Sequence, residues 1–243
     1  MPYPQQLTDL QNDVLSRVNE ASSSTAGDLR SGNGASATIA TLATITQNLN
    51  EGSADLARYA YPIQDTGTYT SLPIGTQYVS LSSASLTMGT TGNVLWAARS
   101  VTWNGTPLTH CSRSSIEQWY TALGTWPNDS GTPLYWYENG EDGIGIYPLP
   151  STAKTLKISG LVIPKQLSSG SDVPTWFQPD QVKLIVFQAA GRLALKNLDD
   201  PSLAERAQVW LGEFEKGKNE LLIRLWQTDP QLAAAHFPKP TGV

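Results

Sequence analysis

Three carboxylates at one predicted turn are the residues best suited to acid–base chemistry in this chain of 243 residues. Glu138, Glu141 and Asp142 surround Gly140, directly after an aromatic run. A glycoside hydrolase uses such a pair, because one acid protonates the leaving oxygen while the other activates water or attacks the sugar. Charges at a hairpin tip are usually solvated, and nothing in the sequence indicates a buried acid here. Glycan hydrolysis is therefore an alternative hypothesis, and we expect a protein that is not an enzyme.

The two histidines do not complete a nucleophilic centre with the single cysteine. His110 precedes Cys111 on a predicted strand, where adjacent side chains point to opposite faces, so it cannot simply activate the thiol. A lone cysteine also excludes an internal disulfide, and the ligand sets of structural zinc sites are missing from the sequence. We expect no metal and no cofactor.

Two glycine patterns resemble nucleotide motifs without matching them. Gly212, Gly217 and Lys218 have the spacing of a phosphate-binding loop, but Asn219 replaces its Ser/Thr and the segment lies inside a predicted helix. Three further glycines lack the dinucleotide spacing and lie in a predicted hairpin: Gly140, Gly143 and Gly145. We expect no nucleotide site.

Composition narrows the classes of partner. The net charge is −5, from 21 acidic and 16 basic residues, and no cluster of Lys or Arg offsets it locally. Such a chain has no basic field for a nucleic-acid backbone, so we expect no sequence-specific DNA binding. The N-terminus lacks a secretory pattern and no apolar stretch approaches a membrane span, so we expect no membrane association.

The clearest predicted elements are two helices near the C-terminus. The first begins at Pro179 and runs to about Leu198, with apolar residues on both sides, which predicts a helix surrounded by protein. The second begins at Pro201 and has one charged face. The short connection predicts that the two helices are antiparallel neighbours.

The N-terminal part has a helical pattern with an interruption. Apolar residues three or four apart predict a helix from Thr8 to Glu20. Residues 21–36 are nearly all small and polar, which predicts a loop that is flexible or ordered by a partner. A second helix is predicted from about Ser36 to Tyr61, where Pro62 ends it.

Residues 64–163 have strand and turn composition. Asn104-Gly105 predicts one tight hairpin, and the segment from Leu134 to Tyr147 predicts another. A further strand is predicted from Thr155 to Ile163, and Ser114 with Glu117 is the expected cap of a short helix.

Aromatic residues gather around the second hairpin. Alternation along the strand sends Tyr135 and Tyr137 to one face and Trp136 to the other, so we expect one set in the core and the other available to a partner.

These segments predict an α+β fold, in which the N- and C-terminal segments form a helical bundle that carries a β-rich insertion. The expected division is into N-terminal bundle helices (1–62), the β-rich insertion (63–165), the helical pair (166–229) and an extended tail (230–243).

The order of these segments resembles the head-to-tail adaptor proteins of tailed bacteriophages. The segments that carry the resemblance are the N-terminal helix with Leu7, Leu10 and Val14, the run from Asn50 to Arg58, Gly131 to Tyr137, Ile144 to Pro150, Asp172 to Pro174, and Leu195 to Pro201. Together they span most of the chain.

The resemblance implies a structural virion protein at the head–tail junction. It implies a ring of usually twelve copies, with one face on the portal and the other on a tail nozzle or tail-completion protein. DNA would pass through the channel without sequence-specific binding. No chemistry is implied.

A ring subunit needs contact residues for its partners, and the C-terminal segment is our candidate for a portal or neighbouring-subunit contact. Its expected contact residues are Gln231, Leu232, His236, Phe237, Pro238, Lys239 and Pro240. An unstructured terminus is the competing interpretation.

Two alternatives from other functional classes stay open. Some short-tailed-phage adaptors are thought to cut peptidoglycan, so the carboxylates at the second hairpin would fit a peptidoglycan hydrolase carried in the phage neck or tail. The many aromatic residues would also fit a free-standing carbohydrate-binding module.

Overall fold

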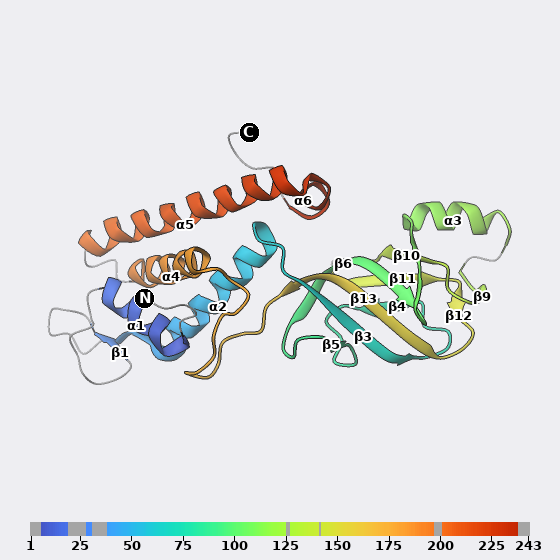
Figure 1. Ribbon diagram of the computed structural model, residues 1–243, viewed down its shortest axis with the longest axis horizontal. Helices are drawn as coiled ribbons and strands as arrows, with labels where there is room; N and C mark the ends of the chain where they lie inside the picture. Colours follow the sequence, from blue (N-terminus) through green and yellow to red (C-terminus); the bar gives the residue numbers. More distant parts are fainter. Residues whose placement is uncertain are drawn as a thin grey trace. The chain divides into compact units, whose positions relative to one another are not determined.

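The computed structural model describes residues 6–18, 28–30, 38–124, 127–140, 142–196 and 201–237. The chain forms two compact units, a helical unit of residues 1–61 and 166–243 and a β unit of residues 62–165. Helices and sheets are largely segregated between these units (Figure 1). The α+β class predicted from the sequence is confirmed.

The helical unit contains five helices and one small β-hairpin among its described residues. These are α1 (Leu7–Arg17), β1 (Asp28–Arg30), β2 (Thr38–Thr41), α2 (Leu42–Tyr59), α4 (Pro179–Ala194), α5 (Pro201–Thr228) and α6 (Pro230–His236).

Helix α4 is the central element of the helical unit. It packs against α1, α2 and α5, which explains why its sequence is apolar on more than one side. Its buried residues include Val182, Ile185, Val186, Ala189, Ala190 and Leu193. The prediction of a helix surrounded by protein is confirmed, although α4 ends at Ala194 and the predicted end, Leu198, lies outside the described residues.

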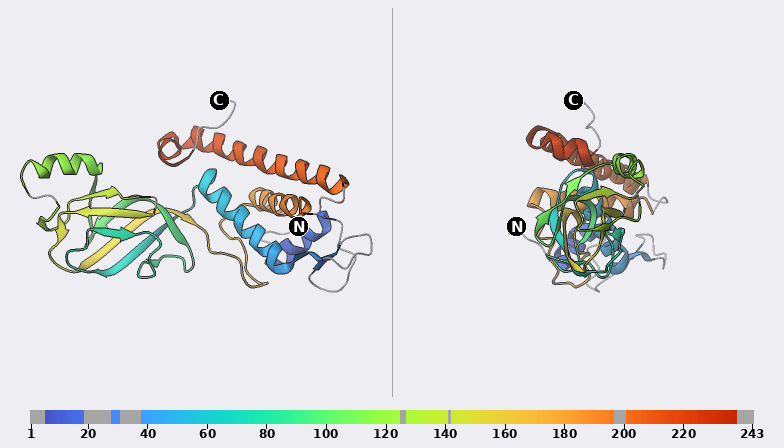
Figure 2. Two further views of the ribbon diagram at one scale, coloured as in Figure 1. Left: turned by 180° about the vertical axis from the view of Figure 1, so that it is seen from behind. Right: turned by 90° about the vertical axis from the view of Figure 1, so that its right-hand side faces the viewer.

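Two glycines let α4 and α5 approach closely. A Cβ at Gly191 would lie 2.7 Å from the Leu211 side chain, and a Cβ at Gly217 would collide with Leu184. The first contact joins the end of α4 to the first half of α5, and the second joins the start of α4 to the later part of α5. The helices are therefore antiparallel, as predicted, and Figures 1 and 2 show them side by side from opposite directions.

The N-terminal boundaries differ from the prediction. The segment expected to be a loop contains β1, which pairs with β2, while residues 19–27 and 31–37 lie outside the described residues. The second helix begins at Leu42 and not near Ser36, because the β-branched residues before it favour an extended strand. The hydroxyl of Thr41 then caps α2 by accepting a hydrogen bond from the Thr44 N–H at 3.2 Å.

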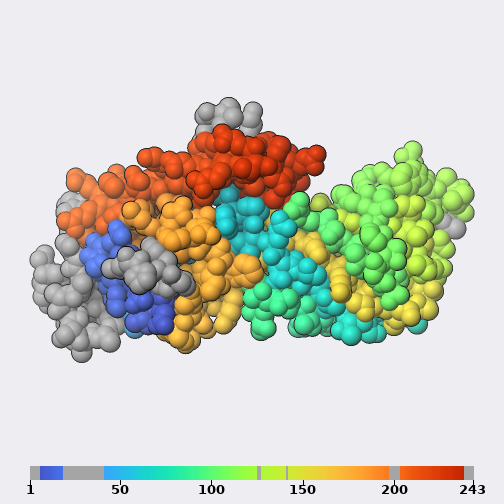
Figure 3. Space-filling view, in the orientation of Figure 1, coloured from blue at the N-terminus to red at the C-terminus, as the bar shows by residue number. Residues whose placement is uncertain are grey.

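The segment predicted to be an extended tail is helical from Pro230 to His236, so that prediction is wrong for these residues. Proline suits the first helical position, and the Asp229 carboxylate accepts a hydrogen bond from the Leu232 N–H at 2.9 Å. Helix α6 follows α5 almost directly and packs against it. The outer side of α5 and α6 faces solvent in the space-filling view (Figure 3).

The β unit contains two main sheets and one short pair of strands. The five-stranded sheet has the order β5-β3-β13-β6-β7, with β13 at its centre, and the four-stranded sheet has the order β4-β11-β10-β8. Strands β9 and β12 pair separately. The bounds are β3 (Gln64–Leu72), β4 (Tyr78–Ser80), β5 (Thr87–Met88), β6 (Val94–Trp103), β7 (Thr106–Pro107), β8 (Thr109–His110), β9 (Ser130–Gly131), β10 (Tyr135–Glu138), β11 (Gly143–Tyr147), β12 (Leu149–Pro150) and β13 (Lys154–Ile163), with helix α3 at Arg113–Thr121.

Both predicted hairpins are confirmed. Asn104 and Gly105 have φ values of 49° and 86° between β6 and β7, as a tight turn with two left-handed residues requires. Strands β10 and β11 form the second hairpin. The predicted cap of α3 is wrong by two residues, because the Ser112 hydroxyl accepts the hydrogen bond from the Ser115 N–H.

The aromatic strand β10 is covered on both faces, which corrects the expectation of one core face and one free face. Trp136 is 3% exposed and Tyr137 is fully buried, although they point in opposite directions. The Tyr137 ring lies over Gly145, where no Cβ would fit. Only Tyr135 of the three aromatic residues is partly exposed.

The same substitution at two glycines should move stability in opposite directions. Gly191→Ala places a methyl group against Leu211 and should destabilise the protein by about 1–3 kcal/mol. The higher helix propensity of alanine offsets part of this loss. Gly212→Ala meets no atom within 4 Å and should stabilise α5 by about 1 kcal/mol. Denaturant unfolding followed by circular dichroism measures both, and equal shifts would contradict the close α4–α5 packing.

Candidate assembly site

The predicted carboxylate cluster is not assembled among the described residues. Glu138 and Asp142 are both exposed, and Asp142 accepts a hydrogen bond from the Ser82 hydroxyl at 3.4 Å. Glu141 lies outside the described residues. Within the described ranges, no three His, Cys, Asp or Glu side chains lie together in a way that could hold a metal ion.

His110 and Cys111 have separate surroundings. The His110 ring stacks on Trp136, with ring centroids 4.3 Å apart. The half-buried Cys111 packs against a cluster formed by Ile116, Tyr137 and Tyr147. These contacts make the histidine and the cysteine packing residues of the β unit.

The phenols around this cluster are held in their neutral form. Burial, together with the neighbouring phenol of Tyr78, raises the pKa of Tyr137 above its usual range. A hydrogen bond with Tyr135, together with burial, raises the pKa of Tyr120 to about 12. Both groups are therefore protonated at neutral pH and act as hydrogen-bonding parts of the packing.

The near-match to a phosphate-binding loop lies within α5, as expected. Gly217 packs against Leu184, and Lys218 pairs with Glu215 at 2.6 Å. These residues serve helix packing and helix-surface charge pairing.

The C-terminal contact residues predicted from the sequence fall into three groups: buried residues, residues at the surface, and residues outside the described ranges. Leu232 and Phe237 are buried in the helical unit, where they contribute to its core. Gln231 is exposed and His236 is half-buried on the same short helix. The remaining three, Pro238, Lys239 and Pro240, lie outside the described residues.

The run from Asn50 to Arg58, one of the segments that carry the family resemblance, lies on α2 and fixes α2 to its surroundings. The Asn50 side chain makes two hydrogen bonds to the backbone of Leu167, accepting from its N–H at 2.8 Å and donating to its carbonyl at 2.9 Å. Both backbone groups of a buried residue are thereby satisfied. The loop between β13 and α4 is held against α2 in this way.

A second part of the run joins α2 to α4. The Arg192 guanidinium donates to Glu51 and, at 3.1 Å, to Asp55. Asp55 also accepts a hydrogen bond from the Gln188 amide at 2.6 Å. Gly52 lies where the Gln188 side chain passes, so a Cβ there would clash. The acids and the glycine of the run are explained by internal contacts.

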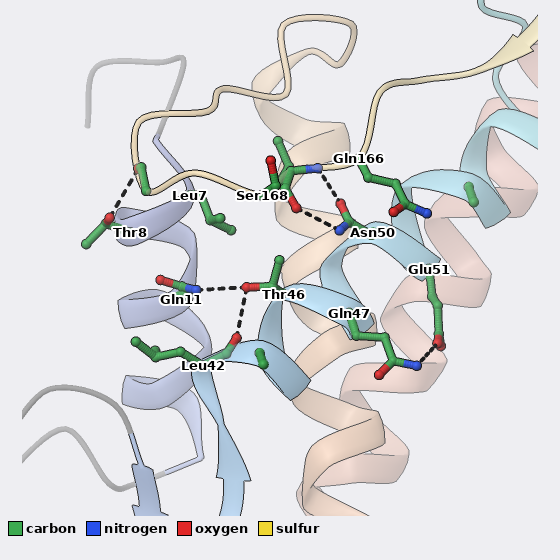
Figure 4. Close-up of a pocket in the computed structure, with 14 residues that line it drawn as sticks. Leu7, Thr8, Gln11, Leu42, Thr46, Gln47, Asn50, Glu51, Gln166 and Ser168 are labelled. Atoms are coloured by element: carbon green, nitrogen blue, oxygen red, sulfur yellow. Dashed lines mark hydrogen bonds between the residues drawn. The ribbon is translucent and has the colours of Figure 1, made fainter. Parts of the chain in front are cut away.

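Beside these contacts lies a groove of about 850 Å³, which we call the α1–α2 groove. It is bounded by α1, α2 and the loop after β13, and its walls contain aliphatic side chains and uncharged amides (Figure 4). The lining residues used below are Leu7, Gln11, Leu42, Gln47, Leu167 and Gln166.

Hydrogen bonds fix the walls of this groove. The Gln11 amide donates to the Thr46 hydroxyl at 2.9 Å, and that hydroxyl donates to the Leu42 carbonyl at 2.8 Å. At the start of α1, the Leu7 N–H donates to the carbonyl of Asp172 in the loop after β13 at 2.8 Å. The loop is thus held from both α1 and α2, which gives the groove a defined shape (Figure 4).

This groove could not be located from the sequence. Its walls come from segments about 160 residues apart, and most of its side chains belong to no motif. Only the asparagine at the start of the α2 run, Asn50, marks the place where the loop attaches.

The β unit has an exposed apolar area near α3. Trp119 is 50% exposed, Leu123 70% and Leu134 53%. The Trp119 ring lies 6.2 Å from that of Tyr135, which connects this area to the aromatic cluster. Exposed aromatic and aliphatic side chains of this kind suit contact with another protein.

Two surface features among the described residues, the amide-lined α1–α2 groove and the exposed apolar area, suit contacts with other proteins. Comparison with known families identifies the class. The chain belongs to the SU10 adaptor protein family, whose family model matches residues 5–236. This is a phage head-to-tail adaptor family, so the resemblance predicted from the sequence is confirmed.

No curated protein sequence matches the chain. Among the residues that the structure describes, no helix is both long and apolar enough to cross a lipid bilayer. The protein is a structural adaptor of a bacteriophage, and its place is in the virion.

Replacing Asn50 by alanine should separate the loop from α2. The substitution leaves the N–H and carbonyl of buried Leu167 without their partner, which should lower the free energy of unfolding by about 2 kcal/mol. The control is Gln47→Ala, an exposed position on the same helix, which should change stability by less than about 0.5 kcal/mol. Equal effects in chemical denaturation would show that Asn50 does not hold the loop.

Proposed function

We propose that this protein is the subunit of a head-to-tail adaptor ring that joins the portal to the tail. The observation that carries the proposal is the family match across residues 5–236, which includes both units. One face of the ring meets the portal, and the other meets a tail nozzle or tail-completion protein. The ring has twelve copies, as the resemblance to phage adaptors implies.

In this proposal the protein functions by joining its partners in a fixed geometry. Repeated contacts around a ring reinforce one another, because each further contact forms at high effective concentration once the first has formed. Rigid internal packing supports this role, since α4 is buried between α1, α2 and α5. The protein works without catalysis, and the exposed, separate carboxylates Glu138 and Asp142 agree with that.

DNA passes through the ring without sequence-specific binding. The net charge of −5 supplies no basic field to retain a phosphate backbone during passage. The ring therefore continues the channel of the portal, and the protein resides at the head–tail junction of the virion, having assembled in the host cytoplasm.

Two kinds of surface are available for the partner contacts. The exposed apolar area around Trp119 and Leu123 belongs to the β unit. The C-terminal segment after Phe237 follows α6 in the sequence and contains Lys239 between two prolines. We assign the C-terminal segment to the portal or a neighbouring subunit.

Co-sedimentation with the cognate portal tests the proposal. The full chain should move with the portal as a complex of discrete mass, and unrelated phage portals serve as the control. A chain that stays separate from its portal at micromolar concentrations would contradict the proposed function.

Two truncations should distinguish partner contact from core packing. Removing residues 238–243 should weaken incorporation into the portal complex at least tenfold while leaving the thermal transition unchanged, because no described core residue is lost. Ending the chain at Thr228 also removes buried Leu232 and Phe237, and should cost about 3–6 kcal/mol of stability. If the chain that lacks only residues 238–243 is incorporated as well as the full chain, the C-terminal segment makes no partner contact.

A further inference from the structure

The α1–α2 groove has the size and chemistry of a binding site for an extended peptide. Its volume of about 850 Å³ lies within the size range of ligand sites in proteins. Leu7, Leu42 and Leu167 supply apolar surface, while Gln11, Gln47 and Gln166 supply amides. A side-chain amide both donates and accepts, so it can pair with the backbone of an extended segment.

The electrostatic character of the groove is simple. Glu51 is the only charged residue among those that line it. One face of its carboxylate contacts Arg192, and its other oxygen accepts a hydrogen bond from the Gln47 amide at 3.0 Å. The Glu51 side chain is still 43% exposed, so the groove favours a segment with a positive charge over one with a negative charge.

We propose that residues 238–243 of one copy bind in the α1–α2 groove of the next copy in the ring. This inference rests on the proposed ring function and identifies the neighbouring subunit, not the portal, as the partner of the C-terminal segment. The segment reads Pro-Lys-Pro-Thr-Gly-Val.

Charge selects this segment from the parts of the chain outside the described residues. Residues 1–5, 19–27, 31–37, 125–126 and 197–200, together with position 141, contain no lysine or arginine. Lys239 therefore gives residues 238–243 the only basic side chain in this set. It complements the acidic Glu51 of the groove.

The chemistry of the segment also suits the groove. Its two prolines have no N–H to satisfy and restrict the backbone, so less conformational freedom is lost on binding. The carbonyls of the segment remain available to the amides of Gln11, Gln47 and Gln166. Val243 offers an aliphatic side chain to the leucines.

The places of the two surfaces favour a head-to-tail contact. The segment leaves the helical unit from α6, which packs on α5, whereas the groove is formed by α1, α2 and the loop after β13. A contact between two different surfaces of identical subunits is heterologous, and it closes into a ring when the rotation between neighbouring copies allows closure.

Disulfide trapping in the assembled protein tests the inference. The variant carries Cys111→Ser, Ala43→Cys and Thr241→Cys, so that the only two thiols lie in the groove and in the segment while Lys239, Glu51 and the groove amides are kept. After assembly with the portal and mild oxidation, a denaturing gel should show a ladder of covalently linked copies. The matched control carries Gln208→Cys, at an exposed position of α5, in place of the groove cysteine and should stay monomeric.

Three outcomes would overturn the inference. These are a ladder of equal strength in the control, a monomer linked only within itself, and no linkage although electron microscopy shows rings on the portal. The last outcome would leave the proposed function intact. If the unmodified protein forms no ring with the portal, the proposed function fails and the inference falls with it.

Charge reversal provides an independent reading of the same contact. Gln47→Lys neutralises the attraction of the groove and should reduce ring formation at least tenfold, as should Lys239→Glu. The double variant should recover part of the loss, because the new lysine of the groove can pair with the new carboxylate of the segment. Absence of recovery, with both single variants folded, would contradict pairing between the segment and the groove.

Discussion

The helical unit depends on how α2 is fixed to α4 and to the loop after β13. Arg192 reaches two carboxylates one turn apart on α2, and Asn50 holds both backbone groups of Leu167. The ion pairs are partly exposed and contribute little energy by themselves. Their geometry sets the register of α2 on α4, and that register determines where the loop attaches and therefore where the α1–α2 groove forms.

The family signature can be understood from these contacts. The run from Asn50 to Arg58 contains an amide for the loop, acids for Arg192, and a glycine where Gln188 passes. Such residues maintain the fold through contacts within the helical unit. The same run also borders the α1–α2 groove, through Asn50 and Glu51, so in our proposal it helps to shape the surface that receives the C-terminal segment.

The sequence was sufficient for elements whose signals are local. Apolar residues on several sides of α4 predicted its burial. The Asn104-Gly105 pair predicted a hairpin, because its tight turn needs two residues with positive φ. The predictions were wrong where contacts between residues far apart in the sequence determine the structure. Residues 230–236 lack a long helical pattern and become helix because Leu232 and Phe237 are buried against the unit, and Tyr137 and Trp136 are both covered because Gly145 admits the tyrosine ring. The groove could not be predicted, since it forms only when the loop after β13 lies against α1.

Electron microscopy of the protein mixed with its cognate portal tests the central claim most directly. Images of the complex, compared with each protein alone, should show an additional closed ring beneath the portal, with density for the helical and β units in every copy. A monomer that leaves the portal unchanged would contradict the adaptor-ring account.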